Sequence, residues 1–258
     1  MIVNKISLVY FSPTGTTQRM VRAIVGALPL PVEEYDFTLG TSPTPSFLPE
    51  DFVILGIPVY SGRVPKPALE RFAALHGQGT PTLLVATYGC RAFDDALLEL
   101  RNFVEDRGFY PSGAAAIAVQ HSIVPSIGAG RPADREMPTI ARMGEQVLGK
   151  MKMIHSSYQL PLVMVPGKQP YHKYSAAPFH PHAGKNCTGC GLCAAQCPVR
   201  AISKDNPRIT DKSRCLSCMR CAKVCPSHAR SLSPWQLSLA KLALSGKCDN
   251  EKAHDLFL

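Results

Sequence analysis

Eight of the ten cysteines lie in two short runs with the same spacing. Each run reads C-x-x-C-x-x-C-x-x-x-C-P, first over residues 187–198 and again over residues 215–226. Thiolates at this spacing are the ligands of 4Fe-4S clusters, and the fourth cysteine of each run ligates the cluster held by the other run. The spacing therefore predicts two clusters with exchanged ligands. The predicted ligand sets are Cys187, Cys190, Cys193 and Cys225 for the first cluster, and Cys215, Cys218, Cys221 and Cys197 for the second.

Zinc binding and disulfide formation are the other roles for closely spaced cysteines. Zinc sites usually combine paired C-x-x-C units, and they have neither a third cysteine in each run nor a trailing Cys-Pro. Disulfides are uncommon in a reducing compartment. The pattern favours iron-sulfur clusters, with zinc as the alternative.

A second group of residues with the right chemistry for binding lies near the N-terminus, in YFSPTGTTQRM (residues 10–20). Hydroxyl side chains and a glycine follow an apolar segment and precede a helical pattern. Amides at a helix N-terminus attract a phosphate, and hydroxyls add further donors. The lysine and glycine spacing of a P-loop and the dinucleotide fingerprint are both missing. The stretch predicts a phosphate-binding loop, with an unoccupied helix cap as the alternative.

The elements that position these groups follow from the periodicity of the chain. Near-continuous apolar runs alternate with helical patterns, which indicates a parallel sheet covered by helices on both faces. The expected strands are residues 5–11, 32–37, 51–60, 80–88 and 114–121. Helices are expected from Met20 to Leu28, from Leu97 to a stop at Gly108, and from Pro132 to about residue 154. The predicted fold class is α/β, a doubly wound five-stranded parallel sheet.

The rest of the chain has a different composition. Residues 156–183 are rich in proline and lack periodicity, so we expect a linker across the surface whose histidines, His172, His180 and His182, are solvated. Ser233 and Pro234 are typical of a helix start, and that helix is expected to dock the tail onto the protein. The predicted units are residues 1–155, the linker 156–183, a cysteine-rich unit over 184–232, and a helix and tail over 233–258.

The N-terminal unit resembles the flavodoxins, on its S-x-T-G-x-T loop after the first strand. In that family the loop binds the phosphate of FMN, and two further flavin loops follow the third and fourth strands. Here those loops are PVYSGRVPK (residues 58–66) and TYGCRAFDDAL (residues 87–97). The resemblance implies cofactor contacts from Ser12, Thr14, Gly15, Thr16 and Thr17 in the first loop, Val59, Tyr60, Ser61, Gly62 and Arg63 in the second, and Thr87, Tyr88, Gly89, Arg91 and Phe93 in the third.

Within these loops the resemblance assigns some roles and leaves others open. The Ser61–Gly62 peptide is expected to turn its carbonyl toward the flavin upon reduction, and Arg91 to balance charge on the reduced ring. Tyr60 and Phe93 are each compatible with stacking on the ring and with an ordinary core position. The loop of residues 126–132, which follows the fifth strand, is expected at the same edge of the sheet.

Residues 184–230 resemble the bacterial two-cluster 4Fe-4S ferredoxins, which implies a small α+β domain. The whole chain resembles bacterial fusions of a flavodoxin-like domain with such a ferredoxin. The resemblance implies FMN and two 4Fe-4S clusters as cofactors, and electron transfer to or from a redox partner protein. The alternative is an FMN-dependent oxidoreductase that reduces a small molecule such as a quinone. Neither redox step requires a catalytic acid, base or nucleophile from the protein.

The distribution of charge and the hydropathy of the chain limit the classes of partner that we expect. Residues 1–150 have 13 basic and 14 acidic side chains, whereas residues 151–258 have 15 basic and 5 acidic ones. Anionic clusters offset part of this excess, and the remainder suits an acidic redox partner. Nucleic-acid binding is not expected, because no recognition helix stands out. The sequence has no apolar run of about 20 residues, so we expect no membrane span. We expect a cytoplasmic location.

Overall fold

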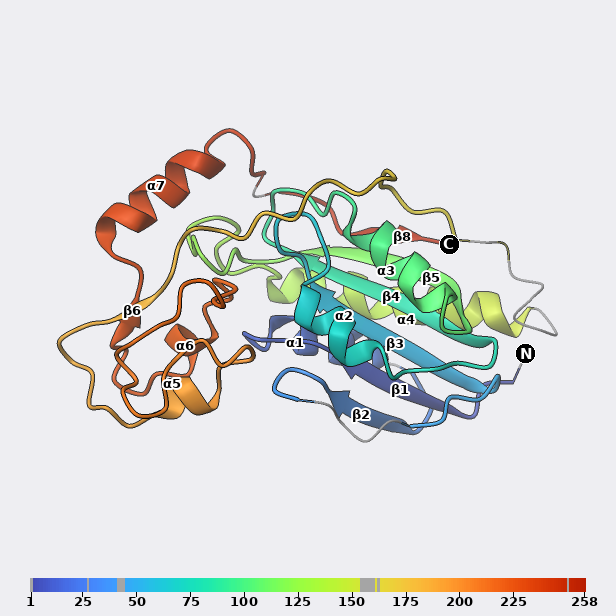
Figure 1. The fold of residues 1–258 in the computed structure, drawn as a ribbon. Coiled ribbons are helices and arrows are strands. Elements are labelled where there is room, and N and C mark those ends of the chain that lie inside the picture. Colours follow the sequence, from blue (N-terminus) through green and yellow to red (C-terminus); the bar gives the residue numbers. More distant parts are fainter. Residues whose placement is uncertain (1, 27, 41–44, 154–160, 162, 250) are drawn as a thin grey trace.

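A computed structural model describes residues 2–26, 28–40, 45–153, 161, 163–249 and 251–258 (Figure 1). The N-terminal part is a sheet with helices on both faces. Its elements are β1 (Lys5–Tyr10), α1 (Thr16–Val25), β2 (Val32–Asp36), β3 (Asp51–Pro58), α2 (Lys66–Phe72), β4 (Thr80–Tyr88), α3 (Ala96–Glu105), β5 (Phe109–Ala118) and α4 (Met137–Lys152), with a 3-10 turn at Asp134–Glu136.

The strand order is β2-β1-β3-β4-β5-β8, and the first five strands are parallel. The order of these five is that of the flavodoxin-like doubly wound fold, so the predicted fold class is confirmed. Successive residues of β1 face opposite sides: Leu8 packs with α1 and α4, whereas Val9 packs with α2 and α3. Both faces are covered, which explains why β1, β3 and β4 read as near-continuous apolar runs.

Gly56 fixes how closely α1 lies against the sheet. A Cβ atom added at Gly56 would lie 2.6 Å from Cγ1 of Val21 and 2.9 Å from Cγ2 of Thr17. The helix therefore packs onto the backbone of β3 itself. This contact brings the start of α1, and the loop before it, close to the carboxyl end of the sheet.

Two features of the sheet differ from the sequence expectation. β5 begins at Phe109 rather than at residue 114, because a register irregularity opposite Thr82 and Leu83 accommodates Pro111 and Gly113 in the strand. A sixth strand, β8 (Asp255–Phe257), pairs antiparallel with β5. Leu256 packs against one core and Phe257 against the other. The tail thus covers the edge of β5, which would otherwise be unpaired.

The helix bounds also differ in detail. α4 begins at Met137, five residues after Pro132, and the helix expected to reach residue 154 is described only as far as Lys152, since residues 154–160 lie outside the described part. α2 had no sequence prediction. Among the described residues, no helix combines the length and the apolar character needed to cross a membrane.

The cysteine-rich part forms a small unit beside the carboxyl edge of the sheet (Figure 1). It contains β6 (His182–Ala183), α5 (Leu192–Ala195), α6 (Arg220–Lys223) and β7 (Arg230–Ser231), followed by α7 (Pro234–Leu244). β6 pairs antiparallel with β7. An antiparallel bridge between Ile202 and Thr210 closes a hairpin over residues 202–210.

Candidate functional site

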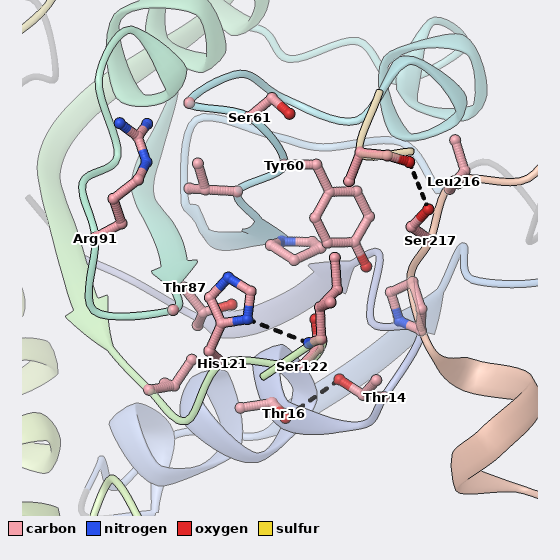
Figure 2. A pocket seen from close by; sticks show the side chains of 18 of the residues that line it. Thr14, Thr16, Tyr60, Ser61, Thr87, Arg91, His121, Ser122, Leu216 and Ser217 are labelled. Atoms are coloured by element: carbon pink, nitrogen blue, oxygen red, sulfur yellow. Dashed lines mark hydrogen bonds between the residues drawn. The ribbon is translucent and has the colours of Figure 1, made fainter. Parts of the chain in front are cut away.

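The main pocket lies where β1, β3, β4 and β5 end, and it contains about 1160 Å³ of space that protein atoms leave free, part of it open to solvent (Figure 2). This edge is where open α/β sheets bind their ligands. Ten of the predicted cofactor residues line it. They are Thr14, Thr16, Thr17, Val59, Tyr60, Ser61, Gly62, Thr87, Gly89 and Arg91.

The first loop is built as an anion site at the start of α1. Gly15, with φ of 79°, takes the left-handed conformation that precedes the helix. The Ser12 hydroxyl accepts from the amide of Gln18 at 3.0 Å, so Ser12 organises the loop. The hydroxyls of Thr14 and Thr16 lie 3.3 Å apart at the pocket (Figure 2). First-turn amides have no acceptor within their own helix, so this end can receive a phosphate.

The second loop turns sharply beneath the pocket. Tyr60 and Arg63 exchange backbone hydrogen bonds of 3.1 Å, and Ser61 and Gly62 between them have φ of 50° and 71°. The Tyr60 ring projects into the cavity (Figure 2). Burial raises the pKa of Tyr60 well above its usual value, with smaller contributions from Cys218 and Tyr174. Tyr60 therefore lies at the pocket and near a predicted cluster ligand, Cys218.

Five predicted cofactor residues are not in the lining of the pocket, and their contacts explain why. Ser12 and Gly15 shape the first loop from within. Arg63 is turned toward α3, where Nη2 and Nε donate to the Glu99 carboxylate at 2.6 and 2.8 Å. Tyr88 is 2% exposed and packs edge-on against Phe93, with ring centroids 5.4 Å apart.

Sequence reasoning missed the loop after β5, where residues 119–123 line the pocket. The neighbouring residues 126–132, which were expected at the same edge, are not in the lining. His121 is the side chain of note. Its Nδ1 accepts from the amides of Ile123 and Val124 at 3.2 and 3.1 Å. The position of His121 at the end of a predicted strand was the available signal.

Those two amide donors fix the tautomer of His121. Nδ1 carries the lone pair, so the proton is on Nε2, which points away from the loop and into the space between Arg91 and Tyr60 (Figure 2). Burial, and then the charge of Arg91, lowers the pKa of His121 to about 4. The pocket therefore contains a neutral imidazole that offers one N–H donor.

The proline-rich segment is packed more closely than the sequence predicted. Val163 is buried in the core, and Tyr174, Ala177 and Phe179 line the pocket. The segment is thus part of the pocket wall and not only a connection across the surface.

His172 is exposed, as expected, but both of its ring nitrogens have partners. Its Nδ1 lies 2.6 Å from Oδ2 of Asp95, and its Nε2 lies 2.6 Å from the Ser61 carbonyl oxygen. Both neighbours are acceptors, which favours the doubly protonated imidazolium. The Ser61 carbonyl, and then Asp95, raises the pKa of His172. The segment therefore holds the second pocket loop through a charged bridge.

The two cysteine runs fold as a structural repeat with residue numbers 28 apart. Gly189 and Gly191 have φ of 75° and 76°, and their counterparts Ser217 and Met219 have φ of 55° and 64°. The amides of Ala201 and Ala229 donate to the Sγ atoms of Cys197 and Cys225, each at 3.2 Å. Equivalent residues thus share one backbone path.

The cysteines of the second run lie with the last cysteine of the first. Burial raises the pKa of Cys218 and Cys221 to about 12 and also raises that of Cys215, and Cys197 adds to the increase at all three thiols. This proximity fits the predicted ligand set Cys215, Cys218, Cys221 and Cys197. Among the described residues no three ligand side chains meet where one metal ion could bind; the ligands of a cluster each bond a different iron.

The cysteine-rich unit supplies part of the pocket wall. Leu216 and Ser217, which lie between Cys215 and Cys218, line the cavity. The Ser217 hydroxyl donates to the Ala177 carbonyl oxygen at 2.9 Å, and Nη1 of Arg220 donates to that of Pro13 at 2.7 Å. One cysteine run therefore borders the same cavity as the first loop.

Comparison with known proteins divides the chain in the same way. Residues 186–229 match the family of 4Fe-4S dicluster domains. The trichloroethene reductive dehalogenase of Dehalococcoides mccartyi is 33% identical over an alignment of 70 residues, which covers 21% of this chain and 13% of that protein. An uncharacterised protein of Methanothermobacter thermautotrophicus is 30% identical over 126 residues, 44% of this chain and 28% of that protein. The chain thus spans less than a third of either relative.

Similar solved structures cover the N-terminal part. A flavodoxin from Streptococcus pneumonia TIGR4 has a TM-score of 0.41 at 16% identity, covering 56% of this chain and 98% of that one. A flavodoxin from the domain Archaea has a TM-score of 0.37 at 16% identity, covering 57% and 99%. From its own topology and from the family match, the chain joins a flavodoxin-like α/β unit to a 4Fe-4S ferredoxin-like unit.

Proposed function

We propose that this chain transfers electrons between two 4Fe-4S clusters, held by the eight cysteines of the runs, and an FMN held in the main pocket, and exchanges them with a redox partner. The clusters supply one-electron chemistry, and the flavin supplies one- or two-electron chemistry. The residues that we propose for FMN are the ten predicted ones in the lining. The protein's part is to hold the cofactors close together.

The observation that carries this proposal is that the cysteine-rich unit forms part of the wall of the pocket. Leu216 and Ser217 belong to the second cysteine run and also line the pocket that begins at Thr14. Tyr60 lines this pocket and lies close enough to Cys218 for that thiol to contribute to the raised pKa of Tyr60. A cofactor in the pocket and one on these cysteines would be separated by few side chains. Connection within one chain also makes transfer independent of diffusional encounter.

The alternative is an FMN-dependent oxidoreductase acting on a small molecule such as a quinone. His121 favours it, because the Nε2–H donor in the pocket could bind a carbonyl oxygen. The loop of residues 126–132, which was expected at the same edge of the sheet, is not in the lining. The pocket is lined instead by Leu216 and Ser217 of the second cysteine run and by residues of α7. This lining supports electron transfer as the first choice.

Anaerobic purification followed by metal and flavin analysis tests the proposal. We expect about eight irons per chain from two clusters, one FMN and no zinc. Reduction by dithionite should bleach the clusters, and the flavin spectrum should follow. Clusters that never equilibrate with bound flavin, or zinc in place of iron, would defeat the proposal. A reducing compartment keeps closely spaced cysteines as thiols, which is why we propose a cytoplasmic location.

A further inference from the structure

The two cysteine runs share a backbone path, but their surroundings differ. In the second run Ser217 and Cys218 are buried, and Leu216 packs against the core of the α/β unit. The equivalent residues of the first run are Thr188, Gly189 and Cys190, and all three are exposed. Because the repeat gives both loops the same conformation, the difference arises from what covers them. The second loop faces the pocket, and the first faces solvent.

Apolar groups lie near the exposed loop. Leu192 at the start of α5 is 40% exposed, and Ile209 in the hairpin is 58% exposed. Arg208 connects the hairpin to the loop, since its guanidinium donates to the carbonyl oxygens of Gly184 at 3.3 Å and Cys187 at 2.7 Å. An exposed cluster ligand therefore lies beside accessible apolar side chains, as in the centre of a protein–protein contact.

The cysteine-rich unit as a whole is strongly positive, and two of its exposed cations lie at this loop. Residues 184–230 contain nine Lys and Arg and two Asp and Glu. Lys185, two residues before the first cysteine, is exposed, and Arg208 is exposed at the loop itself. Positive rim charges steer an acidic protein to its docking site.

We infer that the exposed loop of residues 187–192 is the docking face for an acidic redox protein, and that the buried loop of the second run is the internal face toward the pocket. The inference rests on the proposed function and adds a direction to it. Electrons pass between the partner and the first run, and between the second run and the pocket. The partner's own redox centre supplies or receives one electron at each encounter.

Charge reversal at one lysine tests the docking face in the intact, cluster-loaded chain. Lys185→Glu is paired with the control Lys223→Glu, because both lysines are exposed and Lys223 ends α6, the counterpart of α5 in the second run. The probe is a reduced plant-type ferredoxin chosen for its acidity. Cluster bleaching is followed at low salt, and carbodiimide cross-links between the proteins are mapped by mass spectrometry.

We expect Lys185→Glu to slow bleaching by the ferredoxin about tenfold at low salt, with the effect shrinking as salt rises. Lys223→Glu should change the rate less than about twofold, as for a charge outside the contact. Bleaching by dithionite should be the same in all three proteins, and cross-links should involve Lys185. Equal effects of both variants, cross-links confined to Lys223, or tighter binding of a DNA duplex than of the ferredoxin at equal salt would overturn the inference.

The outcome of the docking test can be distinguished from the outcome of the test of the proposed function. Cluster bleaching by an external protein reports docking even in a chain that binds no flavin. A chain without flavin would defeat the proposed function while leaving the comparison of Lys185 with Lys223 intact. Normal reduction of the flavin by dithionite together with unaffected docking in Lys185→Glu would defeat only the docking face.

Discussion

His121 has a chemical state that only its surroundings can set. A free histidine titrates near pH 6.5, but this one accepts hydrogen bonds from two backbone amides at Nδ1 and is half-buried at the pocket. We expect nitrogen NMR of the imidazole to show the Nε2–H tautomer without titration between about pH 5 and 8, because the pKa of His121 is lowered to about 4. Titration of His121 near neutral pH would contradict the geometry.

The bridge formed by His172 predicts a pH dependence of stability. The pKa of His172 is raised in the folded protein, so its stabilisation is fully present below the unfolded pKa and is lost as the pH rises through the folded value. The pKa of Asp95 is lowered: its hydrogen bonds to His172 and Lys168 outweigh the opposing effect of burial. Its contribution is present above the unfolded pKa and lost as the pH falls through the folded one.

We therefore expect His172→Gln to destabilise the fold most at mildly acidic pH. The difference should be about 0.5–1 kcal/mol after allowance for solvent screening, because the His172 side chain is 40% exposed. It should shrink as the pH rises from about 6 to about 8. Urea unfolding at several pH values measures it, with His182→Gln as control. A difference that grows with pH would contradict the charged bridge.

The packing of α1 on β3 gives a prediction for one element. Gly56→Ala should destabilise the α/β unit by about 1–3 kcal/mol, because the new methyl group would overpack the contact with Val21 and Thr17. Gly149→Ala is the matched control, since it lies in α4 with nothing within 4 Å of its added Cβ. The control should stabilise by about 0.5–1 kcal/mol. Chemical denaturation distinguishes the two, and equal effects would contradict the close approach of α1.

At the level of elements, the sequence predicted those strands whose position depends on a local run of apolar residues. β1, β3 and β4 end within two residues of their expected positions, because buried strands need uninterrupted apolar runs. β8 was missed because three residues carry no periodicity. The partners of His172 were missed because Asp95 and Ser61 lie 77 and 111 residues away in the chain. Contacts of this kind depend on the fold and leave no spacing to detect.

The candidate site shows the same difference between local motifs, which were predicted, and contacts that depend on the fold, which were not. The cysteine spacing and the S-x-T-G-x-T loop are local motifs, and Thr14 and Thr16 lie at the pocket as expected. Arg63 was expected there too, but the carboxylate of Glu99 on α3 attracts it away. The part of the wall formed by Leu216 and Ser217 could not be predicted, because it depends on how two units are placed against each other.

On the scale of the whole molecule, the small core of the cysteine-rich unit suggests dependence on its metal. Cys193, Ala194 and Ile202 form that core, with Cys197 and Cys221 against it, so predicted ligands make up much of it. We expect iron chelation to remove hydrogen-exchange protection from residues 184–230 while the sheet strands stay protected. Protection that survives chelation in both units would show that the cysteine-rich unit folds without iron.

The position of β8 has a consequence for the freedom of the cysteine-rich unit. The chain leaves the α/β unit through the segment that contacts Asp95 and Ser61, and it returns to the same sheet at Asp255–Phe257. A domain joined at one end can swing about its hinge, whereas this one is tied down on both sides, like an insertion. Cutting the backbone after α7 would release one of the two attachments and let the domain rotate, so a nicked protein should show slower and more variable exchange of electrons between its two halves.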